Sequence, residues 1–196
     1  MIKNLHRFIF IALAIFILQA CGSASLGVVP TYNIKTVNVI DHRSVADKRT
    51  LRDNVLSAII FFGDDQLEPN LKNYFIAKLA AKKPGSILKL DIAISQYWVA
   101  DYFPKRMSAG VKEWVFMPNT DTKIVAQNDL PTNTDMVICY FDGVVNGKKI
   151  IAKGVYPYTM NAGSMMVRSD PNFVNAVNRS IDNVVDSIYT QLNQEK

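Results

Sequence analysis

Cysteine and histidine are the side chains best suited to chemistry near neutral pH, and this 196-residue chain has two of each. Cys21 directly follows Leu18-Gln19-Ala20. Phe8 to Leu18 form an eleven-residue run without a charge, preceded by Lys3 and Arg7. That run is too short for a membrane-spanning helix, which needs about 20 apolar residues, but its length suits the central region of a secretory signal. We therefore predict that Cys21 lies at the end of a cleaved leader.

The Leu-Gln-Ala-Cys stretch resembles the lipobox of bacterial lipoproteins. The resemblance implies that residues 1–20 are a signal peptide, and that the Cys21 thiol receives a diacylglycerol and becomes the first residue of the mature protein. Acyl chains such as palmitate would then hold the protein in a lipid bilayer, because each buried methylene contributes about 0.8 kcal/mol. Gly22, which is not Asp, follows the cysteine. By similarity to known sorting rules, this implies an outer-membrane location.

The other candidate chemistry is sparse. His6 lies in the leader, which leaves His42 as the one histidine of the mature chain. The sequence has no His-x-x-x-His or Cys-x-x-Cys spacing for a metal site, and no Gly-x-Ser-x-Gly motif accompanies His42 and Asp41. Cys139 lies in an apolar run, where a free thiol behaves as a small buried hydrophobe. We expect no catalytic residue, metal or cofactor, a solvated His42 and a buried, structural Cys139.

The charge balance argues against nucleic acid as a partner. The leader contains two of the 22 basic residues and no acidic residue, so the mature chain keeps 20 basic against 17 acidic residues. The resulting net charge of +3 is too weak for an electrostatic footprint on nucleic acid. The 176 residues that remain after the leader are enough for one domain with a sizeable core.

A stretch rich in aromatic and basic side chains lies between residues 97 and 117. Large aromatic rings beside cations are common in binding interfaces. This favours a surface for a partner, either another envelope protein or a glycolipid. The same residues allow an alternative, a satellite core beneath a long loop. The candidate surface consists of Trp98, Tyr102, Phe103, Lys105, Arg106 and Trp114.

The chain after the leader divides into a short linker and one domain. Residues 22–30 are small, uncharged and rich in chain breakers. We interpret residues 21–31 as the acylated cysteine and a tether that lifts the rest of the chain off the bilayer. Residues 32–196 contain no internal repeat, and we expect them to form a single domain that faces the periplasm.

The pattern of apolar residues in this domain predicts strands and two helices. The clearest strand covers residues 86–99, where every second residue from Leu88 is apolar and Trp98 continues the same face. Asn146-Gly147 between two β-rich runs predicts a hairpin with a type I′ turn. Asp170-Pro171 suits the start of a long helix. The expected strands are 32–40, 86–99, 136–145 and 148–158, with a further irregular pair at 111–117 and 123–126. Residues 54–62 fit a buried strand or a short helix, and their β-branched and aromatic content favours the strand. The expected helices are 68–83 and 170–192.

Strands with one apolar face need a covering layer, which two amphipathic helices can supply. The sequence therefore predicts an α+β fold, a two-layer sandwich of a mainly antiparallel sheet with two amphipathic helices on one face. The apolar stripe of the second helix is expected at Phe173, Val177, Ile181, Val184, Ile188 and Leu192.

The layout of the mature chain resembles that of YajG-type outer-membrane lipoproteins. The resemblance depends on the lipobox, the Asp41-His42-Arg43 strand end, the alternating strand from Leu88, the Asn146-Gly147 hairpin and the C-terminal helix. It implies a non-catalytic, membrane-anchored lipoprotein that binds or scaffolds another component of the bacterial envelope. The alternatives are an auxiliary of an envelope transport or assembly complex that binds lipid or glycolipid, and a hydrolase. The aromatic insertion at 97–117 departs from the YajG pattern.

Overall fold

The computed structural model describes residues 25–49, 52–54, 59–82, 87–107, 115–116, 123–125, 133–161 and 169–194. Six strands form one sheet: β1 (Thr36–Asp41), β2 (Arg52–Asn54), β3 (Ile59–Phe62), β4 (Lys89–Tyr102), β7 (Met136–Val145) and β8 (Lys148–Pro157). A second, short sheet pairs β5 (Val115–Phe116) with β6 (Lys123–Val125). The helical segments are α2 (Val45–Arg49), the 3₁₀ turn η2 (Asp64–Gln66), α3 (Leu71–Ala81), α4 (Pro104–Met107) and α5 (Pro171–Asn193).

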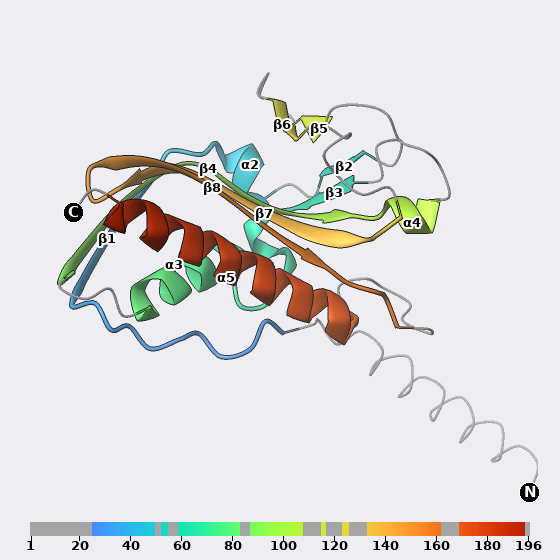
Figure 1. The fold of residues 1–196 in the computed structure, drawn as a ribbon, viewed down its shortest axis with the longest axis horizontal. Coiled ribbons are helices and arrows are strands. Elements are labelled where there is room, and N and C mark those ends of the chain that lie inside the picture. Colours follow the sequence, from blue (N-terminus) through green and yellow to red (C-terminus); the bar gives the residue numbers. More distant parts are fainter. Residues whose placement is uncertain are drawn as a thin grey trace, which may run out of the picture.

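Strand β4 organises the sheet because it pairs along both of its edges. On one edge β7 runs antiparallel to it, and β8 follows β7. On the other edge β1 pairs parallel with the first half of β4, and β3 pairs antiparallel with the second half. Helices α3 and α5 lie together on one face of the sheet (Figure 1). The predicted α+β fold, a mainly antiparallel sheet with two helices on one face, is confirmed.

The C-terminal helix α5 begins and packs as the sequence predicts. The Asp170 side chain accepts hydrogen bonds from the backbone N–H groups of Asn172 and Phe173, and Pro171 lies in the first turn. The predicted apolar stripe is buried against the sheet, with a partly buried Leu192 at its end. In the described ranges, no helix is long and apolar enough to span a membrane.

Helix α3 differs from α5 because it is buried on most of its circumference. Tyr74 and Ala77 are buried in addition to the apolar residues at helical spacing, which are Leu71, Phe75, Ile76 and Leu79. The sheet contacts one side, where the Tyr97 hydroxyl donates to the Leu71 carbonyl, and α5 contacts another, where the Tyr189 hydroxyl donates to the Leu79 carbonyl. A helix that is apolar nearly all round belongs inside a fold. The third side of α3 is covered by residues 25–34, which run beside it (Figure 1).

Strand β8 forms an edge of the sheet, and α5 covers both its face and its free edge. A Cβ at Gly154 would lie only 1.9 Å from a backbone carbonyl oxygen of α5, so the two backbones are in direct contact there. The side-chain amides of Asn183 and Gln191 donate to the carbonyls of Val155 and Ile151 at 3.1 and 2.9 Å. Edge strands with free backbone groups invite pairing with other chains, so these two amides protect β8.

The hairpin predicted from Asn146-Gly147 joins β7 to β8. The φ angles of Asn146 and Gly147 are 49° and 81°, the left-handed values that a type I′ turn requires. Asn146 also ties the turn to β4: its side-chain oxygen accepts from the Asp91 N–H, and its own N–H donates to the Asp91 carbonyl. The predicted hairpin is confirmed.

Three expected strands have clearly different bounds. The strand expected at 86–99 is β4, which begins at Lys89 and ends at Tyr102. The strand expected at 32–40 begins at Thr36, because Ile34 packs into the core before the strand starts. The expected strand 54–62 is not continuous. Its place is taken by the antiparallel pair of β2 and β3, and residues 55–58 lie outside the described ranges.

An irregularity in β4 divides the sheet into two cores. Ile92 and Ile94 face α3 and α5, but the register with β7 shifts between Ile94 and Gln96. One extra residue reverses the alternation of side chains. Tyr97 therefore takes the helix-covered face, and Trp98 turns to the opposite one. The prediction that Trp98 continues the apolar face of the preceding residues is wrong for this reason.

On the opposite face a smaller cluster of buried side chains surrounds Trp98. The Phe61 ring meets it edge-on with ring centroids 5.1 Å apart, and the Tyr140 ring stacks on it at 5.3 Å. We call this cluster the satellite core. Its other members are Ile59, Ala100, Tyr102, Met136 and Ile138.

Candidate functional site

The predicted acylation site, Cys21, lies outside the described residues, which begin at residue 25. We call residues 25–34 the strap. Leu26 is 3% exposed and belongs to the main core. Its N–H donates to the Glu68 carbonyl at 2.6 Å, and its carbonyl accepts from the Asn178 side chain at 3.3 Å. The segment predicted as a tether is therefore bound to the domain at Leu26, because an apolar side chain there fills the core.

The strap is bound a second time at its other end. Ile34 is buried in the main core. The Asn33 N–H donates to the Ala80 carbonyl at 3.1 Å, and its side chain donates to the Ala81 carbonyl. Because Glu68 precedes α3 and Ala81 ends it, the strap follows the helix over its whole length (Figure 1).

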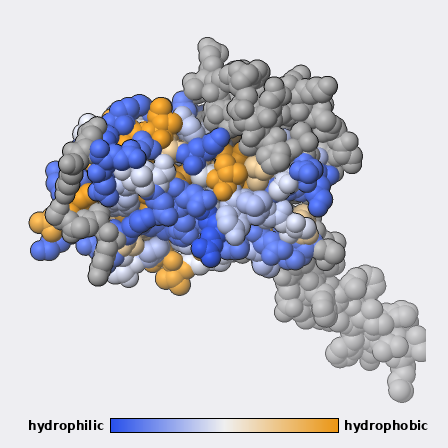
Figure 2. Space-filling view, in the orientation of Figure 1, coloured by the Kyte–Doolittle hydropathy of each residue, from blue (hydrophilic) through white to orange (hydrophobic). Residues whose placement is uncertain are grey.

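Between these bound ends the strap turns apolar side chains outward. Val28 is 92% exposed, Val29 44% and Tyr32 49%. They make up three of the seven large exposed hydrophobic residues in the described chain, within five consecutive positions. Figure 2 shows an apolar patch at the lower rim of the molecule, along the course that the strap follows in Figure 1, among mainly hydrophilic neighbours.

A charged groove of about 470 Å³ opens between α3 and α5, beside the strap. Two ion pairs connect the helices along it, Lys78 with Asp182 at 2.6 Å and Lys82 with Asp186. Arg179 is exposed and, within the described chain, forms no ion pair. The groove is lined by Pro30, Lys78, Ala81, Lys82, Arg179, Asp182, Val185 and Asp186.

The groove carries more positive than negative charge, with three cations against two carboxylates. Lys78 also lies 5.2 Å from the centroid of the Tyr74 ring, and burial together with the Asp182 charge raises the pKa of that tyrosine. Burial raises the pKa of Tyr189, which lies under Lys82, to about 12. The arrangement suits an anionic group beside the unpaired guanidinium of Arg179.

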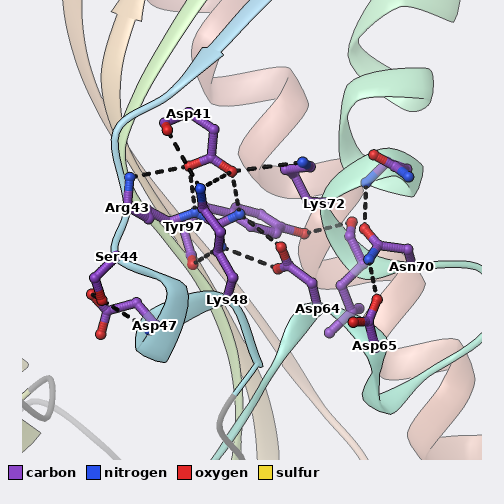
Figure 3. Close-up of polar contacts among 12 residues, drawn as sticks. Asp41, Arg43, Ser44, Asp47, Lys48, Asp64, Asp65, Asn70, Lys72 and Tyr97 are labelled. Atoms are coloured by element: carbon purple, nitrogen blue, oxygen red, sulfur yellow. Dashed lines mark hydrogen bonds and ion pairs between the residues drawn. The ribbon is translucent and has the colours of Figure 1, made fainter.

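The second polar site is a buried ion cluster around Arg43, where β1 ends (Figure 3). The Arg43 guanidinium donates two hydrogen bonds to the carboxylate of Asp41 and two to that of Asp64, at 2.8–3.1 Å. A fifth bond, at 2.9 Å, goes to the backbone carbonyl of Tyr97. These bonds use all five N–H groups of the guanidinium. The same group lies over the Tyr97 ring, 5.5 Å from its centroid.

The charges of this cluster stabilise one another. Burial alone would raise the pKa of Asp41, but its hydrogen bonds and its ion pair with Arg43 outweigh burial and hold that pKa below its usual range. Burial would also lower the pKa of Arg43, and the carboxylates of Asp41 and Asp64 raise it instead. Lys48 and Lys72, which are more exposed, each approach the Asp41 carboxylate at 3.6 Å.

The ion cluster fixes the fold rather than offering groups to a ligand. It connects the end of β1 with η2 and with β4, and no donor of Arg43 is left for an incoming molecule. In the sequence, Arg43 stands out only as part of the Asp41-His42-Arg43 strand end. Its partners Asp64 and Tyr97 are 21 and 54 positions away, so no local pattern marks them. The one available signal was Asp41, two residues before Arg43.

The predicted aromatic and basic surface is largely buried where the structure describes it. Trp98, Tyr102 and Phe103 are 3%, 0% and 9% exposed. Trp98 and Tyr102 belong to the satellite core, which was the alternative interpretation. The prediction of a partner surface is therefore wrong for these three residues. Of the other members, Lys105 is exposed, Arg106 lies in α4, and Trp114 falls outside the described residues.

Three polar side chains of the described chain that the hydrolase alternative could use are Asp41, His42 and Asp101. Asp41 is bound in the ion cluster, and the neighbouring His42 is exposed. Asp101 is fully buried in the second half of β4, where it accepts a hydrogen bond from the Tyr158 hydroxyl at 2.8 Å. The three side chains therefore offer no shared reaction centre.

Cys139 is a free, fully buried cysteine, as predicted. Burial raises the pKa of its thiol, which disfavours the thiolate that nucleophilic chemistry requires. Among the described residues, no three His, Cys, Asp or Glu side chains are grouped so that they could hold a metal ion.

The strap and its groove form the candidate functional site, because their side chains are open to solvent while the ion cluster is closed. Both belong to the same layer of the α+β fold, on the outer side of α3 and α5. No family model, curated protein or solved structure matches this chain.

Proposed function

We propose that the chain is a non-catalytic lipoprotein of the bacterial envelope. In this proposal the acylated Cys21 anchors it in the outer membrane, and its domain faces the periplasm and binds another envelope component. The lipobox-like Leu18-Gln19-Ala20-Cys21 stretch supports the anchor. The observation that carries the proposal is the position of Leu26: the chain enters the core only five residues after Cys21, so an acylated protein would hold its domain close to the bilayer.

The ion cluster supports a binding role over a catalytic one. A catalytic arginine must direct donors at the substrate, whereas all five donors of Arg43 are bound within the fold. The groove beside the strap, in contrast, offers accessible polar groups, among them the exposed Arg179. That arrangement fits a domain that recognises a component at the membrane surface.

Detergent phase partitioning and intact-mass measurement test the anchor. The wild type should enter the detergent phase and have the mass of the leaderless chain plus diacylglycerol. Cys21→Ala should remain uncleaved or soluble, while Cys139→Ala, which removes the other cysteine, should keep the anchor. Wild-type protein in the aqueous phase would contradict the proposal.

Affinity capture from detergent-solubilised envelopes, read by mass spectrometry, tests the binding role. The acylated wild type should enrich a component that the Arg179→Ala variant enriches less. Lys153→Ala provides the matched control, since Lys153 is an exposed cation on the edge strand β8, away from the groove. If both variants recover the component equally, the groove is not part of the binding site.

The groove supports a second candidate, an auxiliary that binds the head group of a lipid or glycolipid. Its charged lining suits a phosphate with neighbouring hydroxyls better than an acyl chain. Titration calorimetry with glycerol phosphate tests this candidate on the wild-type protein. Binding should weaken in Arg179→Ala and persist in Asn175→Ala, an exposed position one turn earlier on α5.

A further inference from the structure

The strap limits how far the domain can move from the bilayer. Leu26 lies five positions after Cys21. A fully extended chain spans at most 3.3–3.6 Å per residue, so these five span about 17 Å. An α-helix with its side chains is about 10–12 Å across. If Cys21 carries lipid, the α3 side of the domain lies within about two helix diameters of the lipid head groups.

We propose that the middle of the strap, with Val28, Val29 and Tyr32, is a membrane-contact surface that inserts among the phospholipid head groups. This inference deepens the proposed function and rests on the acylation of Cys21. Among the exposed apolar side chains of the described chain, these three are the nearest to Cys21 in sequence. Because the connection to the anchor is short, we take the bilayer as the partner that covers this surface.

The chemistry of the three side chains fits the interface between water and lipid. Val28 and Val29 are purely apolar, and Tyr32 combines an apolar ring with a hydroxyl that can stay hydrated. Aromatic rings of this kind concentrate at head-group depth. Exposing these apolar side chains to water costs free energy, and burying them among lipids would remove that cost.

The bound ends of the strap make the surface preorganised. Leu26 and Ile34 are both buried, and backbone hydrogen bonds to Glu68 and Ala80 fix the segment beside them. Little conformational freedom remains to be lost on contact with lipid, which favours binding. The groove beside Pro30 adds Lys82 and Arg179 on the same side, and its excess of cations suits lipid phosphates.

Depth-dependent fluorescence quenching tests the contact on the full acylated protein in phospholipid vesicles. Val28→Cys adds one reactive thiol, because Cys139 is buried and Cys21 is acylated in the proposed form. An environment-sensitive dye at position 28 should shift to the blue and be quenched severalfold more by doxyl-labelled lipids than the same dye at position 151. Ile151 is the matched control, a 54% exposed apolar residue on β8.

The outcomes separate the contact from the anchor. Flotation of the unlabelled wild type with the vesicles reports the anchor. If the protein does not float, both the proposed anchor and the proposed contact are contradicted. If the protein floats but the dye is quenched equally at positions 28 and 151, the anchor is supported and only the proposed contact is overturned. Shielding of position 28 that grows with protein density without quenching by doxyl lipids would identify a second copy of the chain as the occupant, and would also overturn it.

Discussion

The ion cluster and the strap both lie on the helix-covered side of the molecule, and they differ in where their side chains point. In the ion cluster every donor of Arg43 is bound inside the fold. In the strap only the two ends are bound, at Leu26 and at Asn33-Ile34, and the residues between them face outward. The difference teaches that charge alone does not mark a functional surface. The most charged site stabilises the fold, while an uncharged segment is open to a partner.

The largest effect is expected at the centre of the ion cluster. Arg43→Met should lower the free energy of unfolding by about 3–5 kcal/mol, because it leaves the buried Asp64 carboxylate without its cation and removes the guanidinium that binds Asp41. Urea denaturation measures the loss. Lys72→Met removes a cation 26% exposed at the rim of the same cluster and should cost less than about 1 kcal/mol. Similar losses of unfolding free energy for both variants would mean that Arg43 is no more important to the cluster than a cation at its rim.

The apolar stripe of α5 gives the scale for ordinary core packing. Ile181→Ala should cost about 2–5 kcal/mol, because the fully buried side chain leaves a cavity against the sheet. Asn175→Ala, on the exposed side of the helix, should change stability by less than about 0.5 kcal/mol. Thermal unfolding of both variants checks this, and equal shifts would show that the stripe does not face the core.

The strap should respond differently at its bound end and at its middle. Leu26→Ala should cost about 2 kcal/mol, at the low end for a buried leucine because the strap lies at the border of the core. It should also speed hydrogen exchange at the Leu26 N–H, which bonds to Glu68. Val28→Ala should leave stability within about 0.5 kcal/mol of the wild type. A destabilised Val28→Ala protein would show that the middle of the strap is structural.

The smallest effect concerns pH. The folded-state pKa of Asp41 lies below its ordinary value of 3.8, so the ionised carboxylate stabilises the fold fully above that pH. The contribution disappears as pH falls through the lower, folded-state pKa. The melting temperature of the wild type should therefore approach that of Asp41→Asn as the solution is acidified below pH 3.8. A gap between the two that stays constant down to acid pH would contradict the role of Asp41 in the cluster.

The parts of the fold that depend on local signals could be predicted from the sequence. Asn146-Gly147 specifies its turn through its own backbone preferences, and Asp170-Pro171 begins α5 through contacts within one turn. The register shift after Ile94 has no such signal, because it is defined only by the pairing of β4 with β7. The face of Trp98 depended on that shift and was assigned wrongly.

The candidate site was harder to predict than the fold. Residues 25–31 of the strap are mostly small residues and breakers, which are typical of a linker, and among these seven Leu26 alone fills the core. Its partners Glu68 and Asn178 lie far along the chain. The groove likewise depends on the packing of α3 against α5, so its cations look like ordinary surface charges in the sequence.

The amides of α5 that cap β8 have a consequence for crowding. Lipid anchors concentrate proteins in two dimensions, where neighbouring molecules meet often and in similar orientations. A bare edge strand would then allow the sheet of one molecule to continue into the next, and repeated addition would build a fibre. Asn183 and Gln191 occupy two of the carbonyls that such growth at β8 would need. If Cys21 is acylated as proposed, the helix acts as a terminator that would let many copies share one membrane without polymerising through this edge.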